Sequence, residues 1–324
     1  MKRPYFHSLA MLAATLAAAS LSFAQSSYPD HPVRVIVPFP PGGSVDPIMR
    51  IVGPKLSELM GQPFVIDNRA GANSAIGAGM VAKAAPDGYT LLWTAGSTHV
   101  ILPLQPTQSP DFLKDFAPIA AASRSSYMLA VHNSVPAKTL PELIAYAKAN
   151  PGKLNYASSG VGNLNHLAAE LFNLRAGTKT VHVPYKGGAP AVQDLLAGNV
   201  QMMVTNVPTL QPHVDAGALR ALAYTTARPG EPKVPTFAQY GLAELETIEP
   251  YLVFLAPART PEPVIAKLTA AMQKVLAMPD VIKAIESQLQ SPYFLPAQQL
   301  GERLQRDSAR VKEVIEKGRI VITP

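Results

Sequence analysis

The sequence predicts an α/β protein of two lobes, each built on a mostly parallel sheet flanked by helices. Three observations predict this fold class. Short β-branched runs alternate with amphipathic helix patterns, Gly-rich turns join strands to the helices that follow, and the pattern extends over 324 residues, enough for two domains. No short segment recurs at a fixed spacing, which argues against a solenoid.

The first 24 residues have the pattern of a signal peptide. Lys2 and Arg3 precede the apolar run Leu9–Leu21, and small residues, Ser22 and Ala24, stand at −3 and −1 of a cleavage site. A membrane anchor is the alternative, but the run is short for a bilayer span and has no stop-transfer flank. We therefore expect export and cleavage near Ala24, and the absence of Cys excludes a lipoprotein.

Composition narrows the class of partner. The net charge of +6 is spread along the chain without a run of like charges, which suits weak binding of small anions and argues against nucleic acid. With no Cys, neither disulfides nor a thiol nucleophile is available. Beyond the leader, no apolar stretch reaches the roughly 18 residues of a membrane span, so we expect a soluble mature protein.

The first α/β unit of the mature chain is the most informative. Val33–Val37 predicts a strand, Pro38–Ser44 a turn, and Ile48, Val52 and Leu56 one face of a helix. A strand that ends in Gly-Gly-Ser and opens a helix leaves backbone N–H groups beside the positive end of the helix dipole. The sequence therefore predicts an anion site here that requires no charged side chain.

The rest of the chain repeats this alternation. Thr139 and Glu142 form a capping-box pattern at the start of one of the helices. We predict further strands at Phe64–Asp67, Tyr89–Thr94, Tyr127–Val131, Leu154–Ala157, Thr180–Val183, Val200–Thr205, Leu219–Tyr224 and Glu249–Ala256. We predict further helices from Gly71 to about Ala85, from Thr139 to Asn150, from Leu164 past Phe172, and at Ala189–Ala197, Pro263–Ala277, Val281–Leu289 and Pro296–Gly318.

Motifs for catalysis are missing. The chain lacks a G-x-S-x-G nucleophile elbow, and the turn Pro38–Ser44 lacks the Lys of a phosphate-binding P-loop. His166 and Glu170 are spaced i, i+4, but no second His or Cys joins them in sequence, so a helix-surface or core-edge pair is the better interpretation than a metal site. We expect a protein that is not an enzyme and that uses no cofactor and no metal.

Four Gly-, Ser- or Asn-rich turns follow predicted strands. The carboxyl ends of strands in open α/β sheets are where ligands bind, and turns in two lobes can face each other across a cleft. Plain turn or cap chemistry is the alternative at Ser44, solvated surface at Lys186, core packing at Tyr185, and a capping or loop-pinning role fits Asp46. The candidate ligand-binding residues are Phe39, Pro40, Gly42, Gly43, Ser44, Asn73, Ser74, Thr94, Ser97, Thr98, Ser158, Ser159, Gly160, Gly162, Tyr185, Lys186 and Asn206.

Five segments together resemble a known family. They are Y-P-D-H-P-V-R-V-I-V-P-F-P-P-G-G (Tyr28–Gly43), N-R-A-G-A-N-S-A-I-G-A (Asn68–Ala78), A-A-P-D-G-Y-T-L-L (Ala84–Leu92), L-N-Y-A-S-S-G-V-G (Leu154–Gly162) and V-H-V-P-Y-K-G-G-A-P-A-V-Q-D-L-L-A-G-N-V (Val181–Val200). On these segments the chain resembles, from about Tyr28 to Ile322, the receptors of tripartite tricarboxylate transporters, also called the Bordetella uptake gene (Bug) family.

The resemblance implies a type II periplasmic binding protein with crossing strands between two lobes and a ligand cleft between them. It implies a carboxylate held mostly by backbone amides and water at Phe39–Ser44 and Ser158–Gly162, a two-subunit inner-membrane permease as partner, and a monomer in the periplasm. Residues 25–125 and 250–324 would form lobe 1, and residues 126–249 lobe 2. Thr205 stands where the family often has an acidic residue, which argues against an amino-acid ligand.

Three functions remain open at this point. The first is a receptor for a mono- or dicarboxylate, with an aromatic dicarboxylate and a citrate-like acid both allowed. The second is a periplasmic ligand sensor that feeds a two-component signalling system through the same pocket. The third, an enzyme on this scaffold, has no nucleophile, metal or cofactor motif to support it.

Overall fold

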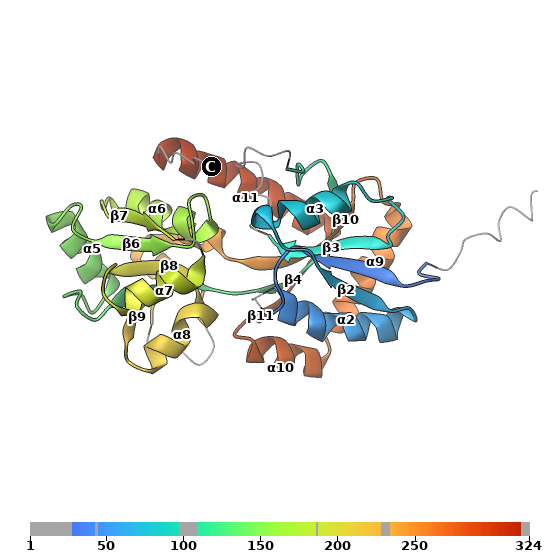
Figure 1. Ribbon diagram of the computed structural model, residues 1–324, viewed down its shortest axis with the longest axis horizontal. Helices are drawn as coiled ribbons and strands as arrows, with labels where there is room; N and C mark the ends of the chain where they lie inside the picture. Colours follow the sequence, from blue (N-terminus) through green and yellow to red (C-terminus); the bar gives the residue numbers. More distant parts are fainter. Residues whose placement is uncertain (1–27, 43–44, 97–108, 186, 228–233, 319–324) are drawn as a thin grey trace, which may run out of the picture.

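The computed structural model describes residues 28–42, 45–96, 109–185, 187–227 and 234–318 (Figure 1). The described chain forms two sheets that lie side by side, each covered by helices on both faces (Figure 1). The signal peptide predicted for residues 1–24 lies outside the described residues.

The first sheet has six strands and forms the core of lobe 1. Strand β1 lies between two parallel partners because each strand is followed by a crossover, and Val35 pairs with Ile66 on one side and Leu91 on the other. In sheet order the strands are β11 (Ser291–Pro296), β4 (Phe116–Arg124), β10 (Tyr251–Pro257), β3 (Thr90–Ala95), β1 (Val33–Val37) and β2 (Phe64–Asn68).

Side chains alternate between the two faces of this sheet. Val35 packs with Trp93 and Phe254 on one face, whereas Ile36 packs with Leu92 and Val253 on the other. The first face is covered by α2 (Asp46–Met60), α9 (Glu262–Leu276) and α10 (Pro279–Ser287), and the second by α3 (Ala75–Ala82) and α11 (Ala297–Gly318). The 3₁₀ turn η1 (Ala72–Ser74) precedes α3, so this helix begins later than the sequence predicts.

The second sheet has five strands and forms the core of lobe 2. In sheet order these are β7 (Val181–Pro184), β6 (Asn155–Ser158), β8 (Met202–Asn206), β5 (Tyr127–His132) and β9 (Leu219–Tyr224). One face packs against α5 (Leu140–Ala149), α6 (Leu164–Ala176) and the turns η3 (Phe237–Tyr240) and η4 (Ala243–Ile248), and the other against α7 (Gly188–Leu196) and α8 (Val207–Asp215).

Both sheets are mixed rather than mostly parallel. β1, β2 and β3 are parallel, as are β6, β7 and β8, but β4, β5, β9, β10 and β11 pair antiparallel. The difference has a topological cause: β4 leaves lobe 1 and β10 returns to it, and two neighbouring strands that carry the chain in opposite directions must run antiparallel. The parallel strands thus lie together on one side of each sheet.

The chain crosses between the lobes at two places. Ser125 and Ser126 join β4 to β5, and Glu249 and Pro250 join η4 to β10. The crossings touch, since Ser125 N donates to Pro250 O at 2.8 Å. All described strands of lobe 1 fall within residues 25–125 or 250–324, and those of lobe 2 within 126–249, while these boundaries as folding units stay a prediction.

Helix α11 also connects the lobes, although its chain belongs to lobe 1. Its residues Val311 and Ile315 pack against Leu167 of α6. Figure 1 shows this long red helix reaching from lobe 1 toward lobe 2. In the described ranges, none of the helices combines the length and apolar character that a bilayer crossing requires.

Candidate functional site

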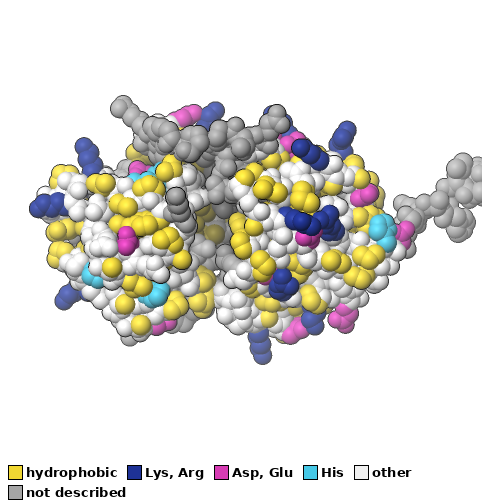
Figure 2. Space-filling model, in the orientation of Figure 1, with side chains coloured by type: hydrophobic (Ala, Val, Ile, Leu, Met, Phe, Trp, Pro, Cys, Tyr) yellow, Lys and Arg dark blue, Asp and Glu magenta, His cyan; other side chains and the backbone are white. Residues whose placement is uncertain are grey.

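The loops that follow the parallel strands of each lobe point toward the other lobe. In lobe 1 these loops follow β1, β2 and β3, and in lobe 2 they follow β6, β7 and β8. Because parallel neighbours end at the same edge of a sheet, each set of loops is brought together. Figure 2 shows the hollow between the two lobes, with Lys and Arg side chains scattered over the face shown rather than gathered in a stripe.

Asp46 holds the loop after β1. Its carboxylate is 2% exposed and accepts hydrogen bonds from Arg50 Nε at 2.8 Å, Asn68 Nδ2 at 2.9 Å and Gly42 N at 3.2 Å. Burial would raise the pKa of Asp46, but these donors outweigh it and lower the pKa below the ordinary value. Asp46 therefore holds the loop in place. The Gly42 N–H, which the sequence predicted as a donor to ligand, donates to Asp46 instead.

The loop after β2 has an unusual backbone. Gly71, Ala72 and Ser74 have φ angles of 135°, 45° and 81°, and Ala72 and Ser74 are non-glycine residues in the left-handed region. Such conformations cost about 1–3 kcal/mol each and gather at ligand clamps and switch regions. Ser74 is buried, and Asn68 Nδ2 also donates to Phe39 O at 3.1 Å, which ties this loop to the one before it.

The loop after β6, Ser158 to Gly162, is held by hydrogen bonds from its own amides to Ser158 and to side chains at the start of α6. Ser158 is buried, and its Oγ accepts from Gly160 N at 3.2 Å. Gly162 N donates to His166 Nδ1 at 3.0 Å, and Ser159 N donates to Asn165 Oδ1 at 3.4 Å. For the amide of Val161, the described residues provide no acceptor. The loop is therefore a rigid turn that uses most of its own N–H groups.

The loop after β7 lies directly on this turn. Tyr185 N donates to Ser158 O at 3.0 Å, and Gly187 N donates to Ser159 O at 3.2 Å. Tyr185 OH donates to Asp194 Oδ2 at 2.6 Å, and burial together with this carboxylate raises the pKa of Tyr185 to about 12. Tyr185 is thus oriented by α7, and it stands at the edge of the Ser158–Gly162 turn.

The remaining predicted residues divide into two groups. Pro40 lies in the loop after β1, and Asn206 stands at the N-cap position of α8, where its side chain makes no capping hydrogen bond. Thr94 is fully buried in β3, so its hydroxyl is not on the surface. Outside the described part of the chain lie Gly43, Ser44, Ser97, Thr98, Lys186 and the side chain of Asn73.

The sequence analysis did not single out Asn165 and His182, and it interpreted His166 only as a helix-surface or core-edge partner of Glu170. His166 and Glu170 do not act as a pair: His166 binds the Gly162 amide, whereas Glu170 accepts from Tyr156 OH. The one available signal was the Ser-Ser-Gly-x-Gly turn followed closely by Asn and His at the start of a helix. Among the described residues, no group of three or more His, Asp or Glu is placed to hold a metal ion.

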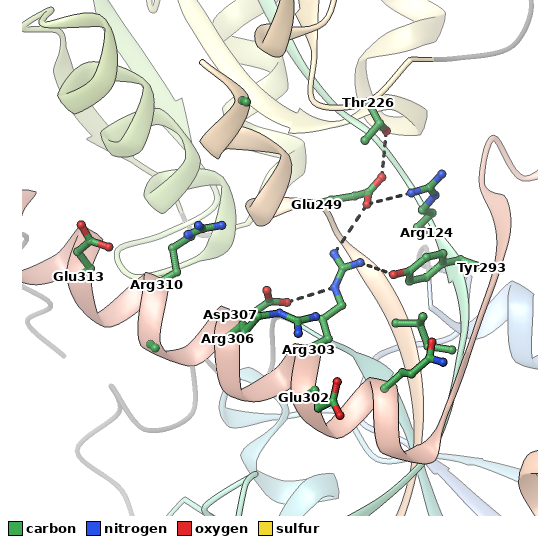
Figure 3. Close-up of a pocket in the computed structure, with 14 residues that line it drawn as sticks. Arg124, Thr226, Glu249, Tyr293, Glu302, Arg303, Arg306, Asp307, Arg310 and Glu313 are labelled. Atoms are coloured by element: carbon green, nitrogen blue, oxygen red, sulfur yellow. Dashed lines mark hydrogen bonds and ion pairs between the residues drawn. The ribbon is translucent and has the colours of Figure 1, made fainter. Parts of the chain in front are cut away.

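A cavity of about 840 Å³ lies beside the crossing segments rather than at these loops (Figure 3). Arg303 of α11 stacks on Tyr251 at 4.2 Å, lies 3.4 Å from Asp307 and 3.8 Å from Glu249, and donates to Tyr293 OH at 2.6 Å. None of the predicted ligand residues is among the described residues that line this cavity. The Arg side chains that line the cavity lie beside Glu and Asp side chains, so its charges are balanced. These contacts hold the crossing segments against α11 and do not form an anion site.

Comparison with known proteins identifies the family. The model of the tripartite tricarboxylate transporter family receptor matches residues 48–320. BugT of Bordetella pertussis is 35% identical over 315 residues, covering 94% of this chain and 96% of BugT. A UPF0065 protein from the tcbD-tcbE intergenic region of a Pseudomonas species is 40% identical over 268 residues, covering 80% of this chain and 78% of that protein.

Solved structures agree with this assignment. The R. palustris protein Rpa4515, determined with adipate, is 33% identical with a TM-score of 0.78, covering 91% of this chain and 99% of that one. MatC of Rhodopseudomonas palustris, determined with bound malate, is 30% identical with a TM-score of 0.72, covering 89% of this chain and 100% of that one. The chain therefore belongs to the receptor family of the tripartite tricarboxylate transporters, a family of periplasmic solute-binding receptors.

Proposed function

We propose that this protein captures a small organic carboxylate between its lobes and presents it to a two-subunit permease in the inner membrane. The related proteins that were determined with adipate and with malate hold carboxylates, and both cover nearly the whole described chain. The proposed ligand is accordingly a mono- or dicarboxylate that is bound and released unchanged.

One observation carries this proposal: left-handed backbone occurs in both sets of opposed loops. Of the four described non-glycine residues with positive φ, two, Ala72 and Ser74, are in the loop after β2. Gly160, Gly162 and Gly187 supply left-handed turns on the other side, with φ of 138°, 78° and 116°. Backbone held in such conformations at two facing edges is typical of a site that binds ligand through main-chain groups.

The chemistry of these edges suits a carboxylate. Helices α2, α3, α6 and α7 begin at the loops, so their positive dipole ends and first N–H groups lie near the hollow between the lobes. We assign the Val161 amide, which has no acceptor among the described residues, as a donor to ligand. Lobe closure excludes water, which strengthens hydrogen bonds between amides and a carboxylate.

A thermal-shift screen of organic acids tests the binding proposal. Purified mature protein is heated with adipate, malate, citrate and an aromatic dicarboxylate, and with the matching diols as uncharged controls. An acid at 100 times its Kd stabilises the folded state by about 2.7 kcal/mol, whereas the diols leave Tm unchanged. If no acid raises Tm at saturating concentration, carboxylate capture is the wrong function.

A deletion strain separates transport from sensing. We expect loss of this protein to abolish uptake of the acid that the screen identifies. A strain that still imports the acid but no longer induces genes in response to it would instead indicate a sensor. The proposed periplasmic location and cleavage after Ala24 are checked by the intact mass of protein from the periplasmic fraction, with Gln25 expected as its first residue.

A further inference from the structure

One buried imidazole, His166, and one half-buried imidazole, His182, hold the Ser158–Gly162 turn at its two ends. At one end Gly162 N donates to His166 Nδ1 at 3.0 Å, and at the other Ser158 Oγ lies 2.6 Å from His182 Nε2. The two rings stack on each other, with centroids 3.9 Å apart and planes 9° from parallel. The turn is therefore fixed through one aromatic pair that spans α6 and β7.

The hydrogen bond from Gly162 defines the tautomer of His166. A backbone N–H only donates, so His166 Nδ1 carries no proton and the neutral ring bears its proton on Nε2. Burial, and then the neighbouring His182, lowers the pKa of His166 to about 4, and burial lowers the pKa of His182 to about 4. Both rings are neutral at pH 7, which is the state in which His166 accepts the Gly162 amide.

The surroundings keep the pair in place. Tyr156 of β6 lies 4.8 Å from His182 with its ring 14° from parallel, and its hydroxyl donates to Glu170 of α6. Burial raises the pKa of Glu170, whose carboxyl accepts this hydrogen bond. His166 itself is 4% exposed, so its ring has little freedom to leave the Gly162 amide.

We propose that His166 and His182 are positioning residues that hold the Ser158–Gly162 turn in the shape that binds ligand. The part of this proposal that concerns ligand affinity rests on the proposed function. The part that concerns the shape of the turn does not, because the two His residues hold the turn in the absence of ligand. His166 acts by accepting the Gly162 N–H, and His182 acts by fixing Ser158, so that the Val161 amide between them is aimed outward.

Paired substitutions at His166 separate the hydrogen bond from packing. His166→Leu fills the buried space but leaves the Gly162 N–H without an acceptor, whereas His166→Asn supplies Oδ1 close to the position of Nδ1. We expect His166→Leu to weaken binding of adipate about ten-fold by calorimetry, and His166→Asn to restore affinity to within about three-fold of the parent protein. His182→Leu and His182→Gln form the corresponding pair at Ser158.

His132 provides a matched control. It too accepts a backbone amide, from Ser134 at 3.2 Å, but it lies at the end of β5 that is farthest from the loops. We expect His132→Leu to leave adipate affinity unchanged. Melting temperatures of all variants show which of them fold.

Hydrogen exchange tests the turn without any ligand. The Gly162 amide is expected to exchange at least ten-fold faster in His166→Leu than in the parent protein, and at the parent rate in His166→Asn. Unchanged exchange in folded His166→Leu, or equal adipate affinity in both variants, would overturn the positioning role. Failure of the parent protein to bind adipate or any other acid counts against the proposed function, whereas the exchange result still decides the role of the imidazoles.

Discussion

At the scale of single residues, Asp46 determines the shape of the loop that follows β1. It is buried and accepts three hydrogen bonds from three different segments. We expect Asp46→Asn to destabilise the protein by about 1–3 kcal/mol, because the amide replaces one acceptor by a donor that faces other donors. Urea unfolding at pH 7 measures this difference.

The pH dependence of this effect has a defined sign. Because the pKa of Asp46 is lower in the folded state, its contribution is present above the ordinary pKa of an aspartate and is lost as the pH falls through the lowered value. The difference between the parent and Asp46→Asn should therefore shrink in acid. Asp280, an exposed partner of Lys55, is the control, and Asp280→Asn should change stability little at any pH.

The sequence predicted the role of Asp46 but not that of His182. Asp46 acts on Gly42 and Arg50, which are four residues away on either side, so local chemistry suffices. His182 reaches Ser158 only because β6 and β7 pair in parallel with Tyr156 opposite His182. The register between two strands depends on how side chains pack on the faces of the sheet, so it cannot be predicted from one segment alone.

At the scale of elements, the strands with ordinary β-propensity were predicted and the atypical ones were not. β4 contains Pro118 and the run Ala120–Ala122, and it forms a strand because β10 and β11 flank it and both its faces are buried. β11 contains Pro292 and Pro296, which an edge strand tolerates. α8 was missed because Pro212 lies inside it.

Gly77 is required for α3 to lie against the end of β1. A Cβ added at Gly77 would lie 2.8 Å from Arg69 O and 2.8 Å from Pro38 Cβ, both close to the loop that follows β1. We expect Gly77→Ala to push the helix outward, to destabilise the protein by about 1–3 kcal/mol and to weaken carboxylate binding. Thermal unfolding and calorimetry with the acid found by the screen measure both effects.

Gly79 is the control in the same helix. A Cβ there would meet nothing within 4 Å, so Gly79→Ala should leave binding unchanged and stabilise α3 by up to about 1 kcal/mol. Equal effects of the two substitutions would show that helix propensity, rather than the close approach at Pro38, governs this region.

At the scale of the whole molecule, α11 restricts how the lobes can move. It packs on β4 of its own lobe and reaches α6 of the other through Leu167, Val311 and Ile315. Arg175 of α6 adds an ion pair to Glu244 of η4 and lies 3.8 Å from Glu313 of α11. The crossings at Ser125–Ser126 and near Pro250 also lie on this side, beside the cavity that α11 lines.

Closure should therefore be a rotation about the side of the molecule that α11 spans, with the loops moving most. The chain has no Cys, so pairs of introduced Cys can carry spin labels without background. Glu58→Cys on α2 with Gln193→Cys on α7 reports the distance across the lobes, and both positions are exposed. Glu316→Cys on α11 with Leu174→Cys on α6 reports the distance at the expected pivot.

Saturating acid should shorten the Glu58–Gln193 distance by several ångströms and leave the Glu316–Leu174 distance nearly unchanged. Glu58→Cys with Lys274→Cys, both on helices of lobe 1, should give the same distance with and without acid. A large change between α11 and α6 would mean that this contact breaks on closure, since packed helices that remain in contact slide by only 1–2 Å or so. In that case α11 would oppose ligand capture, and weakening it with Val311→Ala would raise affinity instead of leaving it unaltered.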